Sequence, residues 1–233
     1  LNKKESLQIV NIQEVPDQTF LDAMLTETAK IKSLKRQLEV VKKVNKIKLD
    51  FESIATHNVL DTMQALSKHS SSDWLVLSWD GRVNNGFLIN NPVGWIVSNI
   101  NSNFALFKDN GVRYIRKVVL AVRPNSRDIN KLIITASNLC KFYNAEFTLL
   151  HVINMSQNSS DISNIKKTAD NLLSDHSIKG EIRIEQAENP TECVSELTAE
   201  YDLLVIGTPR KDTWTSSMLF GTGKDKFASN SAC

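Results

Sequence analysis

Glycines and basic residues follow a strand-like run near the C-terminus (YDLLVI), in a segment whose chemistry suits a phosphate group. Glycine lets the backbone approach a ligand closely and adopt positive φ. The carboxyl ends of parallel strands, with backbone N–H groups and a helix N-terminus nearby, favour bound phosphate. The residues of this segment that could take part in such chemistry include Gly207, Thr208, Arg210, Gly221 and Thr222.

The strongest charge feature is the segment Lys30–Lys48, which holds eight Lys or Arg residues and a single Glu. It is interpreted first as the solvated face of a helix followed by a basic turn. The alternative is contact with anionic lipid headgroups of an inner leaflet, through Lys35, Arg36, Lys42 and Lys43. Nucleic acid is not an expected partner, because the net charge is only +2 and no aromatic residues alternate with the basic ones.

The sequence offers no motif for catalysis or metal binding. Its four histidines have no ligand spacing such as HExxH, and no GxSxG nucleophile turn occurs. His151 lies within a strand-like run and is expected to be a buried imidazole rather than a base. Cys140, Cys193 and Cys233 stand at unrelated spacings, which indicates a reducing compartment without a disulfide framework. We therefore expect no enzyme activity and no metal.

An internal repeat organises the elements that must position these residues. Asp73–Ser78 resembles Asp202–Gly207 in pattern: each is a short β-rich run between an acidic residue and a small one. Earlier strand-like runs also match in order, and these are Gln8–Ile12 with Leu149–Ile153, and Lys48–Ile54 with Glu181–Glu185. Such apolar runs suit parallel strands buried under helices. The repeat predicts a duplicated α/β unit.

Apolar residues at helical spacing fill the gaps between the strands. One stripe runs from Ile129 to Tyr143, and a shorter one includes Val59, Met63 and Leu66. A long helix in the first half is predicted from the stripe Phe20, Met24, Ile31, Leu34, Leu38 and Val41. Pro190 is expected at the first helical position after Asn189. The polar stretch Ser156–Ser163 is interpreted as a surface loop.

The two halves begin and end at different points of the repeat. The second half opens with the strand Arg116–Val122, which has no counterpart in the first half. The first half ends with a strand at Asn103–Phe107, which has no counterpart in the second. We expect domains at 1–110 and 111–233, truncated at both ends: a β-α unit is missing before Leu1 and an edge strand after Cys233.

The second half resembles a universal stress protein domain in its segments KVVLAV, NAEFTLLHVI and YDLLVIGT and in its tail SSMLFGTGKDKFASNSAC. The resemblance implies two tandem Rossmann-like domains, each an open parallel five-stranded sheet with helices on both faces. Many members bind ATP through Gly, two residues, Gly, nine residues and Gly-Ser/Thr. Here Arg210 replaces the second glycine, Gly221-Thr222 comes one residue late, and Arg123 stands where an Asp is usual. The resemblance therefore implies a degenerate nucleotide site formed by Gly207, Thr208, Arg210, Gly221 and Thr222. We expect no cofactor, with ATP as the alternative.

Tandem degenerate domains of this kind resemble the cytosolic C-terminal domains of transporters in the amino acid–polyamine–cation superfamily, cation-chloride cotransporters above all. That resemblance implies a regulatory and dimerisation domain on the cytoplasmic side of the cell membrane. Its partners would be the membrane domain of the parent transporter and a second copy of the chain. The alternatives are a soluble tandem universal stress protein that binds ATP or AMP, and the cytosolic tail of an amino-acid permease.

Overall fold

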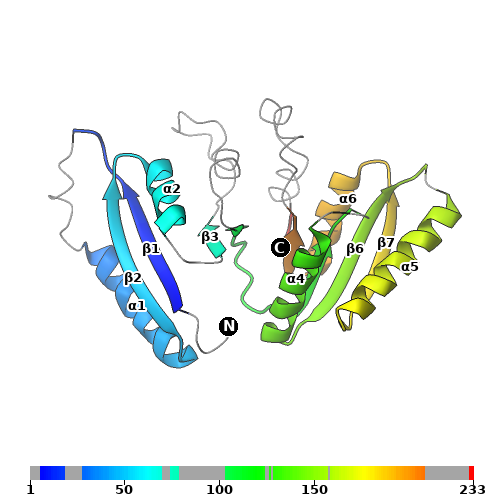
Figure 1. Cartoon of the computed structure of the whole chain (residues 1–233), viewed down its shortest axis with the longest axis horizontal. Coiled ribbons are helices and arrows are strands. Elements are labelled where there is room, and N and C mark those ends of the chain that lie inside the picture. Colours follow the sequence, from blue (N-terminus) through cyan, green and yellow to red (C-terminus); the bar gives the residue numbers. More distant parts are fainter. Residues whose placement is uncertain are drawn as a thin grey trace. The chain divides into compact units, whose positions relative to one another are not determined.

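In a computed structural model of the chain (Figure 1), the structure describes residues 6–18, 28–69, 74–78, 103–123, 126, 128–156, 158–207 and 231–233. The chain divides into two compact units. The first comprises Leu1–Leu75 with Asn99–Asn103, and the second comprises Val76–Ser98 with Phe104–Cys233. No helix within the described ranges is both long enough and apolar enough to span a bilayer.

Two parallel strands and two helices make up most of the first unit. β1 (Ser6–Glu14) pairs with β2 (Lys48–Thr56) in register from Ser6↔Lys48 to Glu14↔Thr56. α1 (Ala29–Asn45) connects them, and α2 (Val59–His69) follows β2. The Thr28 side chain caps α1 by accepting a hydrogen bond from the Ile31 N–H at 3.3 Å. This β-α-β-α order is the one predicted from the repeat.

A second pair of strands forms its own small sheet. β3 (Trp74–Ser78) and β4 (Asn103–Phe107) are hydrogen-bonded to each other, and both lie where the sequence predicted strands. In the second unit, the strand Lys117–Ala121 pairs with a neighbouring strand on each side and so joins the strands into one sheet. Among the described strands, none joins the β1–β2 pair to the β3–β4 pair, so these are separate two-stranded sheets.

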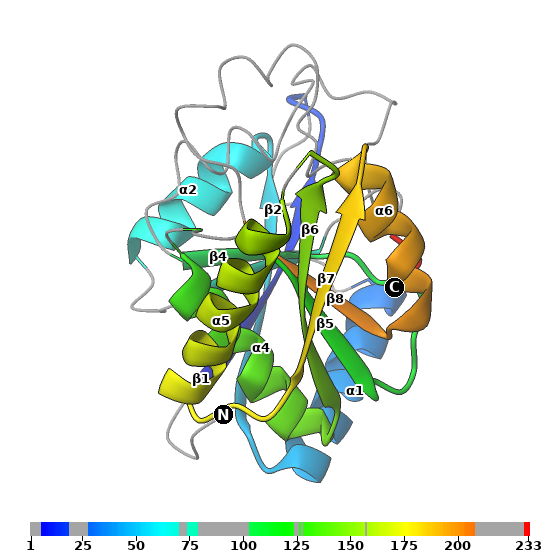
Figure 2. The same ribbon diagram turned by 90° about the vertical axis from the view of Figure 1, so that its right-hand side faces the viewer.

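The second unit holds a four-stranded parallel sheet in the order β7-β6-β5-β8. Figure 2 labels its four strands. The strands are β5 (Lys117–Ala121), β6 (Glu146–Asn154), β7 (Glu181–Ala187) and β8 (Leu203–Ile206). The helices are α4 (Ile129–Tyr143), α5 (Ser159–Asp175), α6 (Pro190–Leu197) and the 3₁₀ turn η2 (Thr198–Glu200). α6 begins at Pro190, as predicted. A fifth strand in each domain stays a prediction.

The core of the second unit lies on both faces of β5. Val118 and Leu120 pack with α4, β6 and α5, whereas Val119 packs with Leu150 and with Val194 of α6. Successive residues of a strand point to opposite faces, so α4 and α5 cover one face and α6 the other. Val118, Val119 and Leu120 are fully buried. This double burial explains why β5 is a continuous apolar run rather than an alternating one.

Asp202, the acidic residue before β8, fixes the start of β5. Its carboxylate accepts hydrogen bonds from the backbone N–H groups of Arg116 and Lys117 at 2.8 and 2.9 Å. Its own N–H donates to the Lys117 carbonyl at 2.9 Å. Hydrogen bonds to a charged acceptor are stronger than neutral ones, so this residue sets the register between two strands far apart in the sequence.

Two predictions from the helical pattern are wrong. Ser156–Ser163 is not a loop throughout, because α5 begins at Ser159 with a capping box between Asn158 and Asp161. Val41 does not continue the buried stripe of α1: it is exposed, and the half-buried position one residue later is Lys42. The aliphatic stem of a lysine can pack along apolar surface while its charge stays in water.

Candidate nucleotide site of the second unit

The carboxyl ends of β5 and β8 open onto a hollow between α4 and α6. Ala121 pairs with Ile206 at the ends of these neighbouring strands, and Gly207 and Val122 follow them. Open parallel sheets bind ligands where the chain reverses its direction of progress across the sheet, and β5 is that point here. Most of the lining is apolar, from Ala121, Val122, Leu132, Leu150, Val152, Pro190, Val194 and Ile206.

The polar part of the hollow is small and well defined. It consists of Arg123, Ser126 and Gly207. Arg123 is exposed, and the Ser126 N–H donates to the Arg123 carbonyl at 3.2 Å in the turn that leads into α4. The hollow measures about 70 Å³, whereas a complete small-molecule pocket has about 300–1,000 Å³. It is therefore large enough for only part of a ligand.

His151 supports the wall of this hollow from inside the sheet. It is 2% exposed, and its Nδ1–H donates to the Val122 carbonyl at 2.8 Å. Burial lowers the pKa of His151 below its ordinary value of 6.5, and the hydrogen bond to Val122 opposes this in part. The imidazole is neutral and structural, as the sequence predicted. It holds the chain in place just before Arg123.

We expect His151 to make the second unit acid-sensitive. Below about pH 6.5 the unfolded chain binds a proton at this residue that the folded chain does not, so folded stability falls as the pH falls. At pH 8, His151→Leu should cost about 1–3 kcal/mol because the Val122 carbonyl loses its partner. Urea titrations from pH 8 to pH 5 should show the wild type and this variant converging. A difference that does not change with pH would contradict the expectation.

The structure brings together only part of the predicted site. Gly207 lines the hollow, and so does Arg123, which the sequence had marked as a departure from the family pattern. Ser126 and Pro190 were not predicted as site residues. Their signal was positional, since they lie at or just before the N-termini of helices that cover opposite faces of the sheet. The other predicted residues lie outside the described residues, and these are Thr208, Arg210, Gly221 and Thr222.

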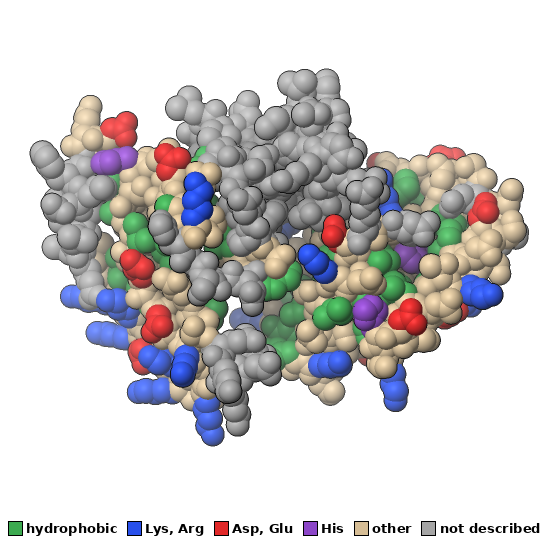
Figure 3. Space-filling view, in the orientation of Figure 1, with side chains coloured by type: hydrophobic (Ala, Val, Ile, Leu, Met, Phe, Trp, Pro, Cys, Tyr) green, Lys and Arg blue, Asp and Glu red, His purple; other side chains and the backbone are tan. Residues whose placement is uncertain are grey.

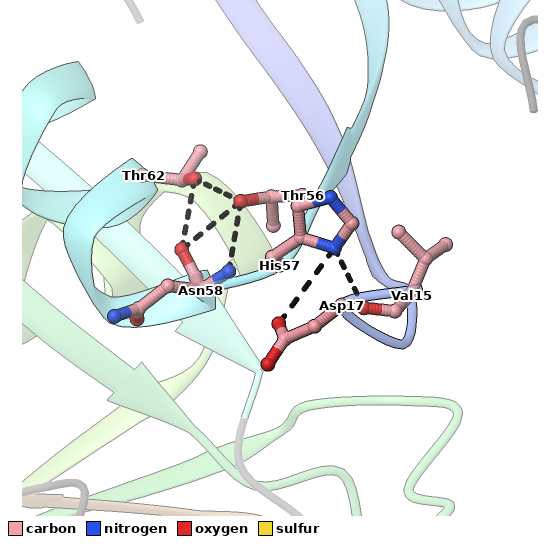
Figure 4. Close-up of polar contacts among 6 residues, drawn as sticks. All are labelled: Val15, Asp17, Thr56, His57, Asn58 and Thr62. Atoms are coloured by element: carbon pink, nitrogen blue, oxygen red, sulfur yellow. Dashed lines mark hydrogen bonds and ion pairs between the residues drawn. The ribbon is translucent and has the colours of Figure 1, made fainter. Parts of the chain in front are cut away.

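The first unit has a polar cluster at the carboxyl ends of β1 and β2 (Figure 4). His57 Nδ1 lies 3.2 Å from the Val15 carbonyl oxygen and 3.9 Å from Asp17 Oδ1. The Asp17 side chain is 93% exposed, so this contact contributes little. Asn58 caps α2 by accepting hydrogen bonds from the N–H groups of Leu60 and Asp61. The cluster joins two strands to a helix and needs no ligand to explain it.

An ionic cluster lies nearer the amino ends of the strands in the second unit. Arg183 donates to Glu185 at 2.7 Å and to both carboxylate oxygens of Glu200 at 2.7 and 3.4 Å. These carboxylates raise the pKa of Arg183, and Arg183 lowers the pKa of Glu200. With Lys117, Thr148 and other residues they line a hollow of about 450 Å³. The guanidinium is paired, so it is not a free anion receptor.

Neither metal nor thiol chemistry is indicated by the part of the chain that the structure describes. Those residues hold no group of three or more His, Cys, Asp or Glu side chains able to bind a metal ion. The three cysteines are unpaired. Burial raises the pKa of the Cys140 and Cys233 thiols to about 11, which keeps both protonated at neutral pH.

Solved structures with a similar fold include universal stress proteins. One from Archaeoglobus fulgidus aligns over 95% of this chain and 81% of its own, with a TM-score of 0.56 and 12% identity. One described as a putative universal stress protein from Pseudomonas aeruginosa UCBPP-PA14 aligns over 97% and 90%, with a TM-score of 0.63 and 13% identity. A functionally unknown protein from Pseudomonas aeruginosa PAO1 aligns over 97% and 89%, with a TM-score of 0.61 and 14% identity.

No protein-family model matches the chain, and no curated protein matches its sequence. The structural likeness at these identities shows the fold alone: α/β, with parallel sheets and helices, of the universal stress protein type. Nothing in the comparisons supports the expected relationship to a cation-chloride cotransporter. The fold that they show is the one named in the alternative interpretation, the universal stress protein.

Proposed function

We propose that the second unit binds an adenine nucleotide, ATP or AMP, with part of the ligand in the hollow at the carboxyl ends of β5 and β8. The observation that carries the proposal is the combination of apolar walls with Arg123 and Gly207 at one rim. Apolar side chains from Val122, Val152 and Ile206 suit the faces of a purine. The hollow therefore has the polarity of a nucleotide site as well as its position in the fold.

The phosphates would lie toward Arg123 and Gly207. A guanidinium provides planar, permanently charged donors for phosphate oxygens. Gly207 carries no side chain at the end of β8, so a phosphate can approach its backbone closely. The described residues that line the hollow include no His, Asp or Glu side chain. The function proposed is nucleotide sensing.

Calorimetry and thermal unfolding with ATP, AMP and GTP test this proposal. A ligand at one hundred times its dissociation constant stabilises the folded state by about 2.7 kcal/mol, which raises the Tm by several degrees. Gly207→Val should abolish the shift by filling the approach to the backbone. Arg123→Ala should weaken binding about tenfold or more, since a hydrogen bond to a charged group contributes about 1.5–3 kcal/mol.

Arg113→Ala is the matched control, because Arg113 is also exposed but lies before β5 and outside the hollow. It should leave nucleotide binding unchanged. Absence of a shift with every nucleotide in the wild type would refute the proposal. Equal loss in the Arg113 and Arg123 variants would show that the charge of the surface, rather than this site, attracts the nucleotide. The homodimer and the location at a membrane stay predictions.

A further inference from the structure

The basic helix α1 carries an apolar stripe on its solvent face in addition to the one that it buries. Ile31 is buried, and Leu34 and Leu38 are half-buried. On the opposite side, Val40 is 60% exposed and Val44 is 73% exposed. These two valines are one turn apart and so lie on the same face. Packing within the first unit does not account for them.

Basic residues flank these valines on the same face. Arg36 precedes Val40 by four positions and Lys43 follows it by three, which places all four side chains along one surface of the helix. Lys32 extends the stripe by another turn. Lys32, Arg36 and Lys43 are exposed. Figure 3 shows Lys and Arg side chains gathered over the part of the first unit where Figure 1 draws α1.

Of the four residues predicted to contact lipid, Arg36 and Lys43 lie on this face, and Lys35 and Lys42 do not. Lys35 is four positions after the buried Ile31 and so lies on the side of α1 that packs inward. Lys42 is half-buried, and its ammonium lies 3.5 Å from a Glu39 carboxylate oxygen. It therefore belongs to the inward edge of the helix. We call Lys32, Arg36, Val40, Lys43 and Val44 the outer face of α1.

We propose that the outer face of α1 docks onto the surface of an anionic lipid bilayer. The positive charge of the outer face favours an anionic partner. Val40 and Val44 favour a partner in whose apolar interior their side chains can be buried. A bilayer surface offers both, with phosphate and carboxylate groups above the acyl boundary. Nucleic acid fits less well, since α1 contains no aromatic side chain on which a base could stack. This inference is independent of the proposed nucleotide site.

Co-sedimentation of the full chain with vesicles tests the proposal. We expect binding to phosphatidylcholine vesicles that contain phosphatidylserine, and none to phosphatidylcholine alone. Each basic residue near an anionic surface contributes about fivefold to binding, so the Arg36→Ala, Lys43→Ala variant should bind about 25-fold more weakly. The Val40→Ser, Val44→Ser variant should lose about tenfold, because its apolar contact with the bilayer is gone.

A matched control is Lys131→Ala with Lys141→Ala, two exposed lysines on α4 of the second unit. This variant should bind as the wild type does, and all variants should keep the wild-type circular dichroism spectrum. Failure of the wild type to bind anionic vesicles would overturn the proposal. An unchanged affinity in the valine variant would also overturn it. So would displacement from the vesicles by duplex DNA or polyglutamate with the same dependence on Val40 and Val44, since the face would then be a macromolecular contact.

Discussion

Replacing Leu120 with alanine is expected to lower the free energy of unfolding of the second unit by about 2–5 kcal/mol. The Leu120 side chain lies at the centre of the sheet and is fully buried, with 0% exposure to solvent. It pairs with Leu149 of β6 on one side and Val205 of β8 on the other. Truncation leaves a cavity that close-packed strands and helices cannot easily collapse into. Urea denaturation followed by circular dichroism measures the change.

The control for this substitution is Ile134→Ala on α4, where the side chain is 46% exposed. That variant should cost under about 1 kcal/mol, since less apolar area returns to water and no closed cavity forms. A Leu120→Ala cost as small as the control's would show that the face between β5 and α4 is loosely packed. In that case the end of β5 would not hold Val122 and Arg123 rigidly in place.

Gly180→Ala is expected to destabilise the second unit by about 1–3 kcal/mol through overpacking. A β-carbon at this position would lie 2.5 Å from Phe147 Cδ1 and 2.9 Å from the Phe147 carbonyl oxygen. The Phe147 ring is 4% exposed and packs within the core, so it has little room to move. The backbone oxygen belongs to β6, which is held in the sheet. Urea denaturation again gives the cost.

Gly111→Asn provides a contrast at a glycine that is needed for a different reason. Gly111 has φ +82° and no atom within 4 Å of an added β-carbon. Asparagine tolerates the left-handed conformation, so this variant should change stability little.

If the clash with the Phe147 ring causes the Gly180→Ala loss, adding Phe147→Leu should cost less than the sum of the two single changes. Strict additivity would contradict that mechanism.

The strands were predictable because their local pattern and their environment agree. Val118, Val119 and Leu120 form an uninterrupted apolar run, and the structure buries all three. β2 begins at Lys48, β7 begins at Glu181 and β4 spans Asn103–Phe107, as the sequence predicted. Parallel strands under helices leave this signal in any sequence with such a fold.

Helix boundaries were less predictable where polar residues dominate. The start of α5 contains three serines and an asparagine among its first six residues, a composition typical of loops. The informative signal was the pair Asn158 and Asp161 at the spacing of a capping box. Because α1 contains few apolar residues, its sequence did not determine whether Val41 or Lys42 faces the core. Only packing against β2 decides which of these side chains turns inward.

For the candidate site, the sequence predicted Gly207 and marked Arg123 as a departure from the family pattern, but it did not predict the groups that hold them. His151 and Val122 are 29 residues apart, and their hydrogen bond depends on the register between β5 and β6. The Arg183–Glu200 pair depends likewise on tertiary packing, since its members are 17 positions apart in the sequence. Such contacts leave no periodicity, because the sequence records each residue type and not its partner.

The strand order β7-β6-β5-β8 also has a consequence for biosynthesis. The second neighbour of β5 is β8. Asp202, which precedes β8 and accepts a hydrogen bond from the Lys117 N–H, is 85 residues further along the chain than Lys117. Pairing across such a separation is slow, because the entropy of closing the loop is lost before the contacts form. An unpaired edge of apolar residues is also prone to aggregation. A nascent second unit therefore leaves the ribosome with one side of β5 open, and of the described strands the last to be synthesised, β8, closes it.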